Sequence, residues 1–331
     1  MKAHFTLRQL VTASLMALVV AIGPSIAAAA DLKSVSVRLD WRPGTQHSPF
    51  FHGRALGYYE EEGIDLRIIT GSGSSDVVTQ VGSRAVEFGL ADALVISQAI
   101  DRGVPIIAIG GYYQRTPIVV MSPQENPVRE PSDLLNQVRL GHNRGSATGQ
   151  GLTAMLAANN IAMEDLTLIP IGFGVEPLLA GQVDAMMGFA QNQPVEAELA
   201  GMPIHSMPIS DHGVESYGLT LVTNPQWIES DPDLVQGFVR ATLRGLRASM
   251  EDPAAAIASV MANVEELDEE LERRKLEITL DYWLGDDGEE ESIGRQTDER
   301  WARTIDVALE LGLIDRPIDP AVIYTQQFIG D

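Results

Sequence analysis

Cysteine is absent from the 331 residues of this sequence. Its absence excludes disulfide bonds, thiolate metal sites and cysteine nucleophiles. It also excludes a bacterial lipoprotein, because the lipid of such a protein is attached to a cysteine that directly follows the export signal. The HExxH, GxSxG and P-loop motifs are missing as well, and the six histidines form no pair at metal-ligand spacing. We therefore expect no catalytic residue, no metal site and no cofactor.

Basic residues are scarce: 23 Lys and Arg stand against 46 Asp and Glu, which gives a formal net charge of −23. A surface of this sign repels nucleic acid and anionic lipid, and no basic patch interrupts it, so we expect no nucleic-acid partner. Two acidic runs, at 265–270 and 286–291, lack the alternating ligand spacing of a calcium loop. We interpret them as a solvated helix face and a loop; a cation site is the weaker alternative.

Long hydrophobic runs are scarce too. The N-terminus carries Lys2 and Arg8, then an apolar run of 11 residues at 13–23, and then three alanines that end at Ala30. This pattern is typical of a secretory signal cleaved after Ala30. The run is shorter than the roughly 20 residues of a spanning helix, and no later segment is apolar enough to span. We expect residues 1–30 to be a signal peptide and the mature chain to be an unanchored protein of the periplasm. An uncleaved N-terminal anchor is the weaker alternative.

Strands and helices alternate along the rest of the chain. Period-2 and short apolar runs predict strands, and 3.6-residue patterns predict helices. The first series has strands at 35–39, 66–69, 88–91 and 106–109 and helices at 50–62, 77–83 and 93–102. The second has strands at 117–121, 138–141, 166–169, 183–188 and 204–208 and helices at 132–135, 149–159, 175–180 and 194–200. A strand at 219–223 then leads into a long helical tail at 232–311. Such alternation predicts parallel sheets covered by helices.

The segment Leu39-Asp40-Trp41-Arg42-Pro43-Gly44-Thr45-Gln46-His47 follows the first predicted strand. An indole beside a carboxylate and an imidazole, at the mouth of an α/β sheet, suits a flat polar molecule. The indole supplies a stacking face, and the other two groups supply hydrogen bonds that fix its orientation. The alternative is that Trp41 is a core aromatic and Asp40 a turn residue.

Two turns rich in glycine and serine, at 71–75 and 144–149, open helices at matching places in the two series. Free backbone N–H groups and the positive end of a helix dipole make such turns candidate docking points for a ligand. The serines and threonines can equally be ordinary N-caps. The candidate ligand contacts in these turns are Ser72, Ser74, Ser146 and Thr148.

At these residues the chain resembles a known family. The opening Leu39-Asp40-Trp41, with Pro43, Thr45 and His47, resembles the opening motif of the NMT1/THI5-like (SsuA/THI5-like) solute-binding proteins. The segments 57–66 (GYYEEEGIDL), 86–91 (VEFGLA) and 178–185 (LLAGQVDA) resemble further motifs of that family, in the same order. The resemblance implies the type II periplasmic binding protein fold, an α/β fold with two lobes, two crossover strands and a ligand cleft between the lobes.

The resemblance also implies how the chain is divided. It places crossovers near 121–122 and 219–223. Residues 31–121 and 222–331 would then form a discontinuous lobe one, and residues 122–221 would form lobe two.

The family pattern further implies ligand contacts. Asp40 and Trp41 match the positions that hydrogen-bond and stack on a heterocycle. His47 matches the motif histidine, although Gly44, Gln46 and Pro49 depart from the Asn, Asn and Gly of the family. In the run 192–196, thiamine-pyrimidine binders carry NxE, and here Gln193 or Glu196 stands for the expected acid. The further contacts we expect from the family pattern are Phe88, Asp92, Asn192, Gln193 and Glu196. Tyr112, next to Gly110-Gly111, is a further candidate stacking face from its place in the sequence, and interdomain packing is the alternative for it.

The function that the resemblance implies is that of a periplasmic substrate-binding component of an ABC importer. We expect a monomer that captures a small aromatic heterocycle of the thiamine pyrimidine precursor type and delivers it to a membrane permease. A riboflavin-type ligand is one alternative. A sulfonate or nitrate ligand is another, which Asp40 disfavours by like-charge repulsion. A pyrimidine-synthesis enzyme of the THI5 type is less favoured, because this chain lacks the cysteine-rich motif of those enzymes.

Overall fold

The computed structural model describes residues 1, 32–143, 146–172, 174–284 and 290–330. The predicted signal peptide, Arg144 and Gly145 of the second glycine-rich turn, and residues 286–289 of the second acidic run lie outside the described residues. Everything below concerns the unit Leu32–Asp331. No helix in the described part of the chain has the length and apolarity needed to cross a membrane.

The first sheet has the strand order β2-β1-β3-β10-β4. Its strands are β1 (Lys33–Arg38), β2 (Ile64–Ile69), β3 (Phe88–Asp92), β4 (Ile107–Gly111) and β10 (Leu219–Thr223). The alternation of β1 buries Val35 and Val37 and leaves Ser34 exposed, as expected for a strand with one covered face. β1 pairs in parallel with β2 and β3, whereas β10 runs antiparallel to β3 and β4.

The second sheet repeats this design, with the order β7-β6-β8-β5-β9. Its strands are β5 (Ile118–Pro123), β6 (Arg139–His142), β7 (Thr167–Pro170), β8 (Ala185–Phe189) and β9 (Ile204–Pro208). β6 pairs in parallel with β7 and β8, and β5 runs antiparallel to β8 and β9. The prediction of purely parallel sheets is therefore wrong: each sheet is mixed. In each sheet, the antiparallel strand is the first one that the chain forms after it crosses from the other sheet.

The chain leaves the first sheet between β4 and β5 and returns between β9 and β10. We call the part around the first sheet lobe one and the part around the second sheet lobe two. The boundaries expected at 121–122 and 221–222 fall inside β5 and β10, whose residues pair wholly within one sheet. We therefore propose that the lobes divide a few residues earlier, in the segments that precede these two strands.

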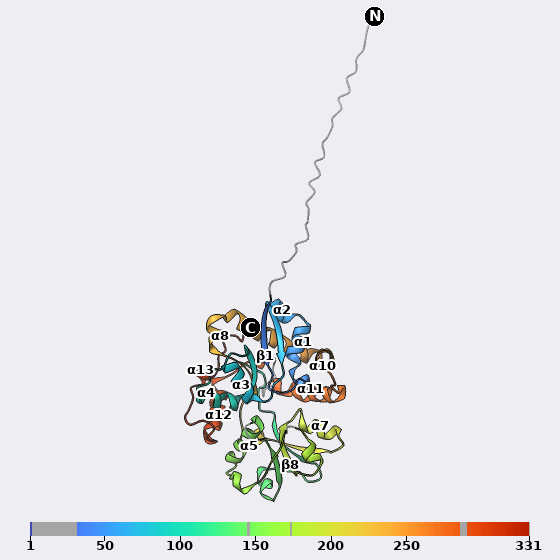
Figure 1. Cartoon of the computed structure of the whole chain (residues 1–331), viewed down its shortest axis with the longest axis vertical. Helices are drawn as coiled ribbons and strands as arrows, with labels where there is room; N and C mark the ends of the chain where they lie inside the picture. Colours follow the sequence, from blue (N-terminus) through green and yellow to red (C-terminus); the bar gives the residue numbers. More distant parts are fainter. Residues whose placement is uncertain (2–31, 144–145, 173, 285–289, 331) are drawn as a thin grey trace. The chain divides into compact units, whose positions relative to one another are not determined.

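Helices cover both sheets. Lobe two carries α5 (Ala147–Ala158), α6 (Glu176–Leu179) and α7 (Gln193–Leu199), and α5 and α7 lie beside β8 in Figure 1. The helices of the remaining chain are α1 (Ser48–Ala55), α2 (Tyr58–Glu61), α3 (Ser74–Gly82), α4 (Ala93–Asp101), α8 (Pro225–Ser230), α9 (Pro232–Glu251), α10 (Pro253–Met261), α11 (Glu269–Trp283), α12 (Asp298–Glu310) and α13 (Pro320–Ile323). Single 3₁₀ turns occupy Thr45–His47, Pro131–Leu135, Met163–Asp165, Ile209–His212 and Glu290–Ser292.

Two helix predictions need correction. The helix expected at 50–62 is two helices, because Gly57 adopts a left-handed conformation (φ 78°) that ends α1 and caps α2. The tail expected at 232–311 is broken into α9, α10, α11 and α12. Asp252 ends the first of these and caps the next by accepting the Ala255 N–H (3.0 Å), which explains why a continuous apolar period does not give one helix.

Candidate ligand-binding site

A hollow is lined by residues of both lobes, and its empty space of about 600 Å³ includes open solvent. Most of its lining follows the carboxyl ends of the parallel strands β1, β2, β6, β7 and β8, where open α/β sheets bind ligands. Lobe one contributes Asp40, Trp41, Gly73 and Ser74, and lobe two contributes Asn143, Ser146, Ala147, Thr148, Ile171, Gly172, Met186, Met187, Phe189, Asn192 and Gln193. We call this hollow the ring pocket.

Backbone hydrogen bonds hold Asp40 and Trp41 in the wall of the ring pocket. The N–H groups of Gly73 and Gly71 donate to the carbonyls of Asp40 (2.8 Å) and Trp41 (3.1 Å). Glycine is required at both positions: a Cβ on Gly71 would lie 1.6 Å from the Leu39 carbonyl oxygen, and Gly73 has φ 118°. The glycine-rich turn therefore fixes the segment that carries the indole.

Asp40 is 8% exposed, and its carboxylate is the single ionisable group among the described residues that line the ring pocket. Its Oδ1 lies 2.9 Å from Nε2 of the fully buried His47. The next turn of the segment is anchored on α11, because the Thr45 N–H donates to Glu272 Oε2 (2.6 Å) and the Thr45 hydroxyl to the Glu272 carbonyl (2.7 Å). This support holds the carboxylate in one orientation.

The wall from lobe two combines apolar and amide groups. Gln193 Oε1 accepts the Phe189 N–H (2.8 Å), which fixes the first turn of α7 against the end of β8. Ser146 is an N-cap, since its Oγ accepts the Gly149 N–H (3.2 Å) and lies 2.9 Å from Thr148 Oγ1. The N-cap interpretation therefore holds for Ser146, which also faces the pocket.

The structure brings together in the ring pocket seven of the predicted site residues: Asp40, Trp41, Ser74, Ser146, Thr148, Asn192 and Gln193. Glu196 lines an adjoining hollow instead. His47 and Asp92 are buried and line neither hollow. Ser72 is exposed. Phe88 and Tyr112 lie in the core, where their rings stack at centroid distances of 3.8 Å on Phe238 and 5.7 Å on Phe50. We carry neither aromatic into the proposed site.

Sequence reasoning missed eight of the fifteen residues that line the ring pocket. The residues not anticipated are Gly73, Asn143, Ala147, Ile171, Gly172, Met186, Met187 and Phe189. A signal for two of them was present: Asn143 and Ile171 come two residues after predicted strands, at the sheet edge where ligands bind. Met186, Met187 and Phe189 carry no such signal, because apolar residues within a strand look the same whether they face a core or a ligand.

Asp92, at the end of β3, lies behind this wall. Its carboxylate caps α4 by accepting the Leu94 N–H (3.0 Å), and its own N–H donates to Ser74 Oγ (3.0 Å). Burial raises the pKa of Asp92 from 3.8 to about 7, the backbone hydrogen bonds to Leu94 and Val95 oppose the shift, and the nearby Asp40 adds to it.

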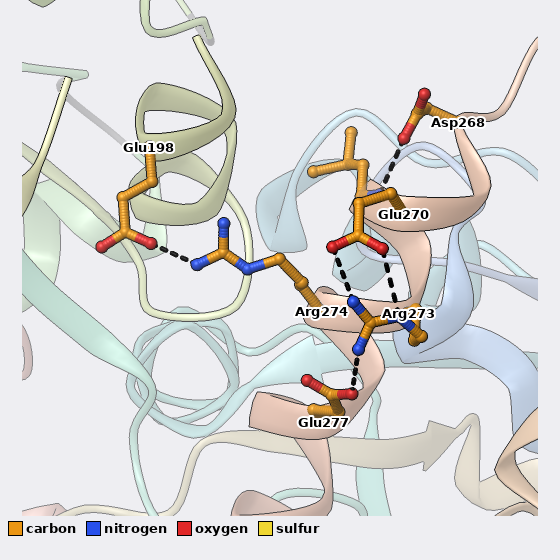
Figure 2. A network of polar contacts seen from close by, with 7 residues as sticks. Glu198, Asp268, Glu270, Arg273, Arg274 and Glu277 are labelled. Carbon is orange, nitrogen blue, oxygen red and sulfur yellow. Dashed lines mark hydrogen bonds and ion pairs between the residues drawn. The ribbon is translucent and has the colours of Figure 1, made fainter. Parts of the chain in front are cut away.

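Ion pairs join α11 to α7 beside the pocket. Arg274 of α11 pairs with Glu198 of α7, whereas Arg273 pairs within its own helix, with Glu270 and Glu277 (Figure 2). Lys275, the next residue, lies 3.4 Å from Glu196 of α7. Since α7 belongs to lobe two and α11 supports the Asp40 segment, these pairs connect the two walls of the site.

Arg274→Glu tests this connection. We expect the radius of gyration of the ligand-free protein to rise, because two carboxylates would then face each other between α11 and α7. Partly exposed pairs contribute about 1 kcal/mol or less, so ligand affinity should fall only about two- to fivefold. X-ray scattering and calorimetry measure both effects. Arg273→Glu is the matched control and should change neither, and equal behaviour of the two variants would contradict the connection.

Two sheets with one crossover in each direction, and a hollow at their carboxyl edges, define a periplasmic-binding-protein fold, and solved structures agree. The alkanesulfonate-binding protein SsuA from Xanthomonas axonopodis pv. citri superposes with a TM-score of 0.70 over 90% of this chain and 100% of that chain, at 15% identity. The fold predicted from the sequence is thereby confirmed. Within this class the chain belongs to the NMT1/THI5 like family, whose model matches residues 44–256.

Curated relatives carry the names of binding proteins and of an enzyme. The riboflavin-binding protein RibY of Chloroflexus aurantiacus is 26% identical over 306 residues (90% of this chain, 86% of that protein). The formylaminopyrimidine-binding protein of Halalkalibacterium halodurans is 25% identical over 281 residues (83% and 84%). A 4-amino-5-hydroxymethyl-2-methylpyrimidine phosphate synthase of Legionella pneumophila is 25% identical over 313 residues (92% and 95%).

Proposed function

We propose that this protein is the periplasmic substrate-binding component of an ABC importer, and that it captures a small, flat, nitrogen-bearing heterocycle of the pyrimidine or flavin kind. One observation carries the proposal: the ring pocket sets an indole and a single carboxylate on lobe one against amides and apolar side chains on lobe two. Trp41 offers a stacking face, and Asp40 accepts hydrogen bonds from amino or ring N–H donors. The names of two relatives, one for riboflavin and one for a formylaminopyrimidine, support this ligand class.

The same lining argues against an anionic ligand. No Lys, Arg or His occurs among the described residues of the ring pocket, while Asp40 would repel a sulfonate or nitrate. The solved neighbour named for alkanesulfonates shares the fold at 15% identity, so it does not define the ligand here.

An enzyme of the pyrimidine-synthase kind is the second candidate, because several relatives bear that name. Binding is favoured over catalysis for two reasons. The described lining contains one ionisable side chain, so it offers no acid–base pair for proton transfer. The chain also lacks cysteine, and the resemblance assigns a cysteine-rich motif to those enzymes.

A thermal-shift screen tests the proposal, using a formylaminopyrimidine, riboflavin and an alkylsulfonate as probes. A ligand that binds only the folded state stabilises it by RT ln(1 + [L]/Kd). We expect stabilisation by one of the ring compounds and none by the sulfonate, with the ligand recovered unchanged after incubation. Stabilisation by the sulfonate alone would replace the proposal with an anion-binding function, and conversion of the bound ring would replace it with an enzymatic one.

Asp40→Asn should weaken binding of the ring compound identified in that screen by about tenfold or more. A charge-assisted hydrogen bond contributes about 1.5–3 kcal/mol, and about 1.4 kcal/mol corresponds to a factor of ten in affinity. Isothermal titration of the variant measures the change. The reverse result, tighter binding after removal of the charge, would show that Asp40 repels the ligand and would favour an anion.

A further inference from the structure

A hollow lies where the chain crosses between the lobes. The crossings are residues 112–117, between β4 and β5, and residues 209–218, between β9 and β10; we call them the crossover segments. The empty space of the hollow is about 770 Å³ and includes open solvent. Its lining comes from the crossover segments and from α12: Arg115, Ser210, Asp211, Val214, Glu215, Ser216, Arg300 and Arg303. We call it the crossover pocket, and it shares no lining residue with the ring pocket.

The two crossover segments lie side by side at this pocket. The Gly218 N–H donates to the Tyr113 carbonyl (3.2 Å), and a Cβ on Gly218 would lie 2.6 Å from the Arg115 carbonyl oxygen. Ser216 is two residues before Gly218, so the backbones of Arg115 and Ser216 are close in the wall of the pocket. Side chains from both crossings therefore meet in one hollow.

Positive charge gathers in the crossover pocket although the chain as a whole is acidic. Three guanidinium groups line it against two carboxylates. The two arginines of α12 are held in place by the protein: Arg303 pairs with Glu215 (2.9 Å) and Glu299 (3.1 Å), and Arg300 donates to the Gln114 carbonyl. The third guanidinium, on the first crossover segment, decides which charge a ligand must carry.

Arg115 and Ser216 offer hydrogen-bond donors to a ligand. Arg115 is exposed and forms no ion pair within the described part of the chain; its guanidinium lies 5.1 Å from the centroid of the Tyr282 ring. Ser216 is 5% exposed, and its hydroxyl makes no hydrogen bond to a described residue. The Ser216 oxygen nevertheless keeps accessible surface, so a small molecule in the pocket can reach it. A buried hydroxyl without a partner is unfavourable unless a ligand or water satisfies it.

These donors favour an anion with at least three oxygens. The forked guanidinium of Arg115 can donate to two oxygens of one anion, and the Ser216 hydroxyl can donate to a third. A carboxylate has two oxygens, so it would leave one of these donors without a partner. A tetrahedral oxyanion such as phosphate or sulfate provides enough acceptors.

The carboxylate of Asp211 separates phosphate from sulfate. Asp211 lines the pocket and accepts the hydroxyl of Ser210 (3.3 Å). An ionised carboxylate accepts hydrogen bonds and repels an anion that brings no proton. Inorganic phosphate keeps at least one proton at neutral pH and can donate it to Asp211, whereas sulfate is fully ionised. A phosphate ester, whose second pKa is about 6, has also lost most of its protons at pH 7.5.

We propose that the crossover pocket binds inorganic phosphate, with Arg115 and Ser216 donating to its oxygens and Asp211 accepting its proton. The inference goes beyond the proposed function and does not depend on it, because the two pockets have no lining residue in common. A phosphate bound there would connect the two crossover segments.

Isothermal titration of the full chain at pH 7.5, with the ionic strength held constant by sodium chloride, tests the proposal. We expect phosphate to bind about tenfold or more tightly than acetate, and about fivefold or more tightly than sulfate and glycerol 3-phosphate. Phosphate should also raise the thermal unfolding midpoint, because it binds only the folded state. Absence of phosphate binding, or equal binding of phosphate and any of the other three anions, would overturn the proposal.

Three variants assign the binding to the crossover pocket. Arg115→Gln should weaken phosphate binding about tenfold or more, and Ser216→Ala about three- to tenfold. Asp211→Asn should bring the phosphate and sulfate affinities within about twofold of each other, because an amide does not repel sulfate. Arg129→Gln removes the same charge at an exposed position outside the pocket and should leave phosphate binding unchanged.

Equal phosphate affinity in Arg115→Gln and Arg129→Gln would place the anion elsewhere and overturn the site. Unchanged affinity in a folded Ser216→Ala variant, or unchanged preference for phosphate in Asp211→Asn, would overturn it as well. If Ser216→Ala does not fold, the exposed Arg115 and Asp211 still decide the matter, since their side chains are not part of the core. None of these results bears on the ring compounds, so the proposed function stands or fails separately.

Discussion

Trp41→Ala is expected to weaken ligand binding by about 30-fold or more while leaving the free energy of unfolding of the ligand-free protein nearly unchanged. The indole is half-buried, lies in the wall of the ring pocket and of the adjoining hollow that Glu196 lines, and is not part of the hydrophobic core. An aromatic side chain of this kind contributes about 2 kcal/mol or more to affinity when a flat ligand stacks on it. Its removal takes little from the packing of either lobe, because the backbone of the segment is held by Gly71, Gly73 and Glu272.

Calorimetry and urea denaturation of the same variant separate binding from stability. Trp227→Ala provides the matched control: this indole is also half-buried, but it lies on α8, contacts Lys33 and lines neither of these two hollows. We expect that control to bind ligand normally. Near-normal affinity in Trp41→Ala, or a large loss of stability, would show that Trp41 acts as a packing residue.

Much of the architecture follows from the sequence for a physical reason. Strands such as β1 and β2 have at least one buried face, so the spacing of their apolar residues predicts them. The alternation of such strands with helices along the chain predicts sheets covered by helices. The direction of β5 and β10 could not be read in this way. An antiparallel strand has the same period as a parallel one, and pairing direction depends on which partner lies beside it in space.

The candidate site was predicted at residues whose polar or aromatic side chains indicate ligand contacts, such as Asp40, Trp41 and Asn192. It was not predicted where the pocket uses residues that a core uses too, such as Met186 and Phe189. The opposite error occurred at Phe88, which begins a predicted strand, and at Tyr112, which follows one: both rings lie in the core. A strand residue points to one face or the other, and the sequence alone does not tell which face bears the ligand.

The hollow that Glu196 lines shows a second limit of prediction from sequence. Gln46 and Glu272 are 226 positions apart, and the structure brings them together because α11 packs on the Asp40 segment. No local sequence pattern predicts this long-range contact. The departure of Gly44 and Gln46 from the family motif gave the only hint that this edge of the cleft differs.

Asp92 gives the second large effect, on stability rather than on binding. Its carboxyl is 1% exposed, and burial raises its pKa from 3.8 to about 7. The folded protein therefore keeps a proton at Asp92 up to about pH 7, whereas the unfolded chain releases it near pH 3.8. Between these values the folded state binds more protons than the unfolded state, so the contribution of Asp92 to stability falls as pH rises. Three pKa units correspond to a total loss of up to about 4 kcal/mol, complete slightly above pH 7.

Asp92→Asn should abolish this slope, because asparagine is uncharged at every pH and still caps a helix through its side-chain oxygen. Urea denaturation at pH 4.5, 6 and 8 should show the variant gaining stability relative to the wild type as pH rises. Asp319→Asn is the matched control: Asp319 also caps a helix through the second N–H that follows it (3.0 Å), but it is exposed. Its stability difference from the wild type should not grow between pH 6 and 8. Parallel pH profiles for Asp92→Asn and the wild type would mean that Asp92 is ionised in the folded protein, and that solvent or a cation reaches the floor of the site behind Ser74.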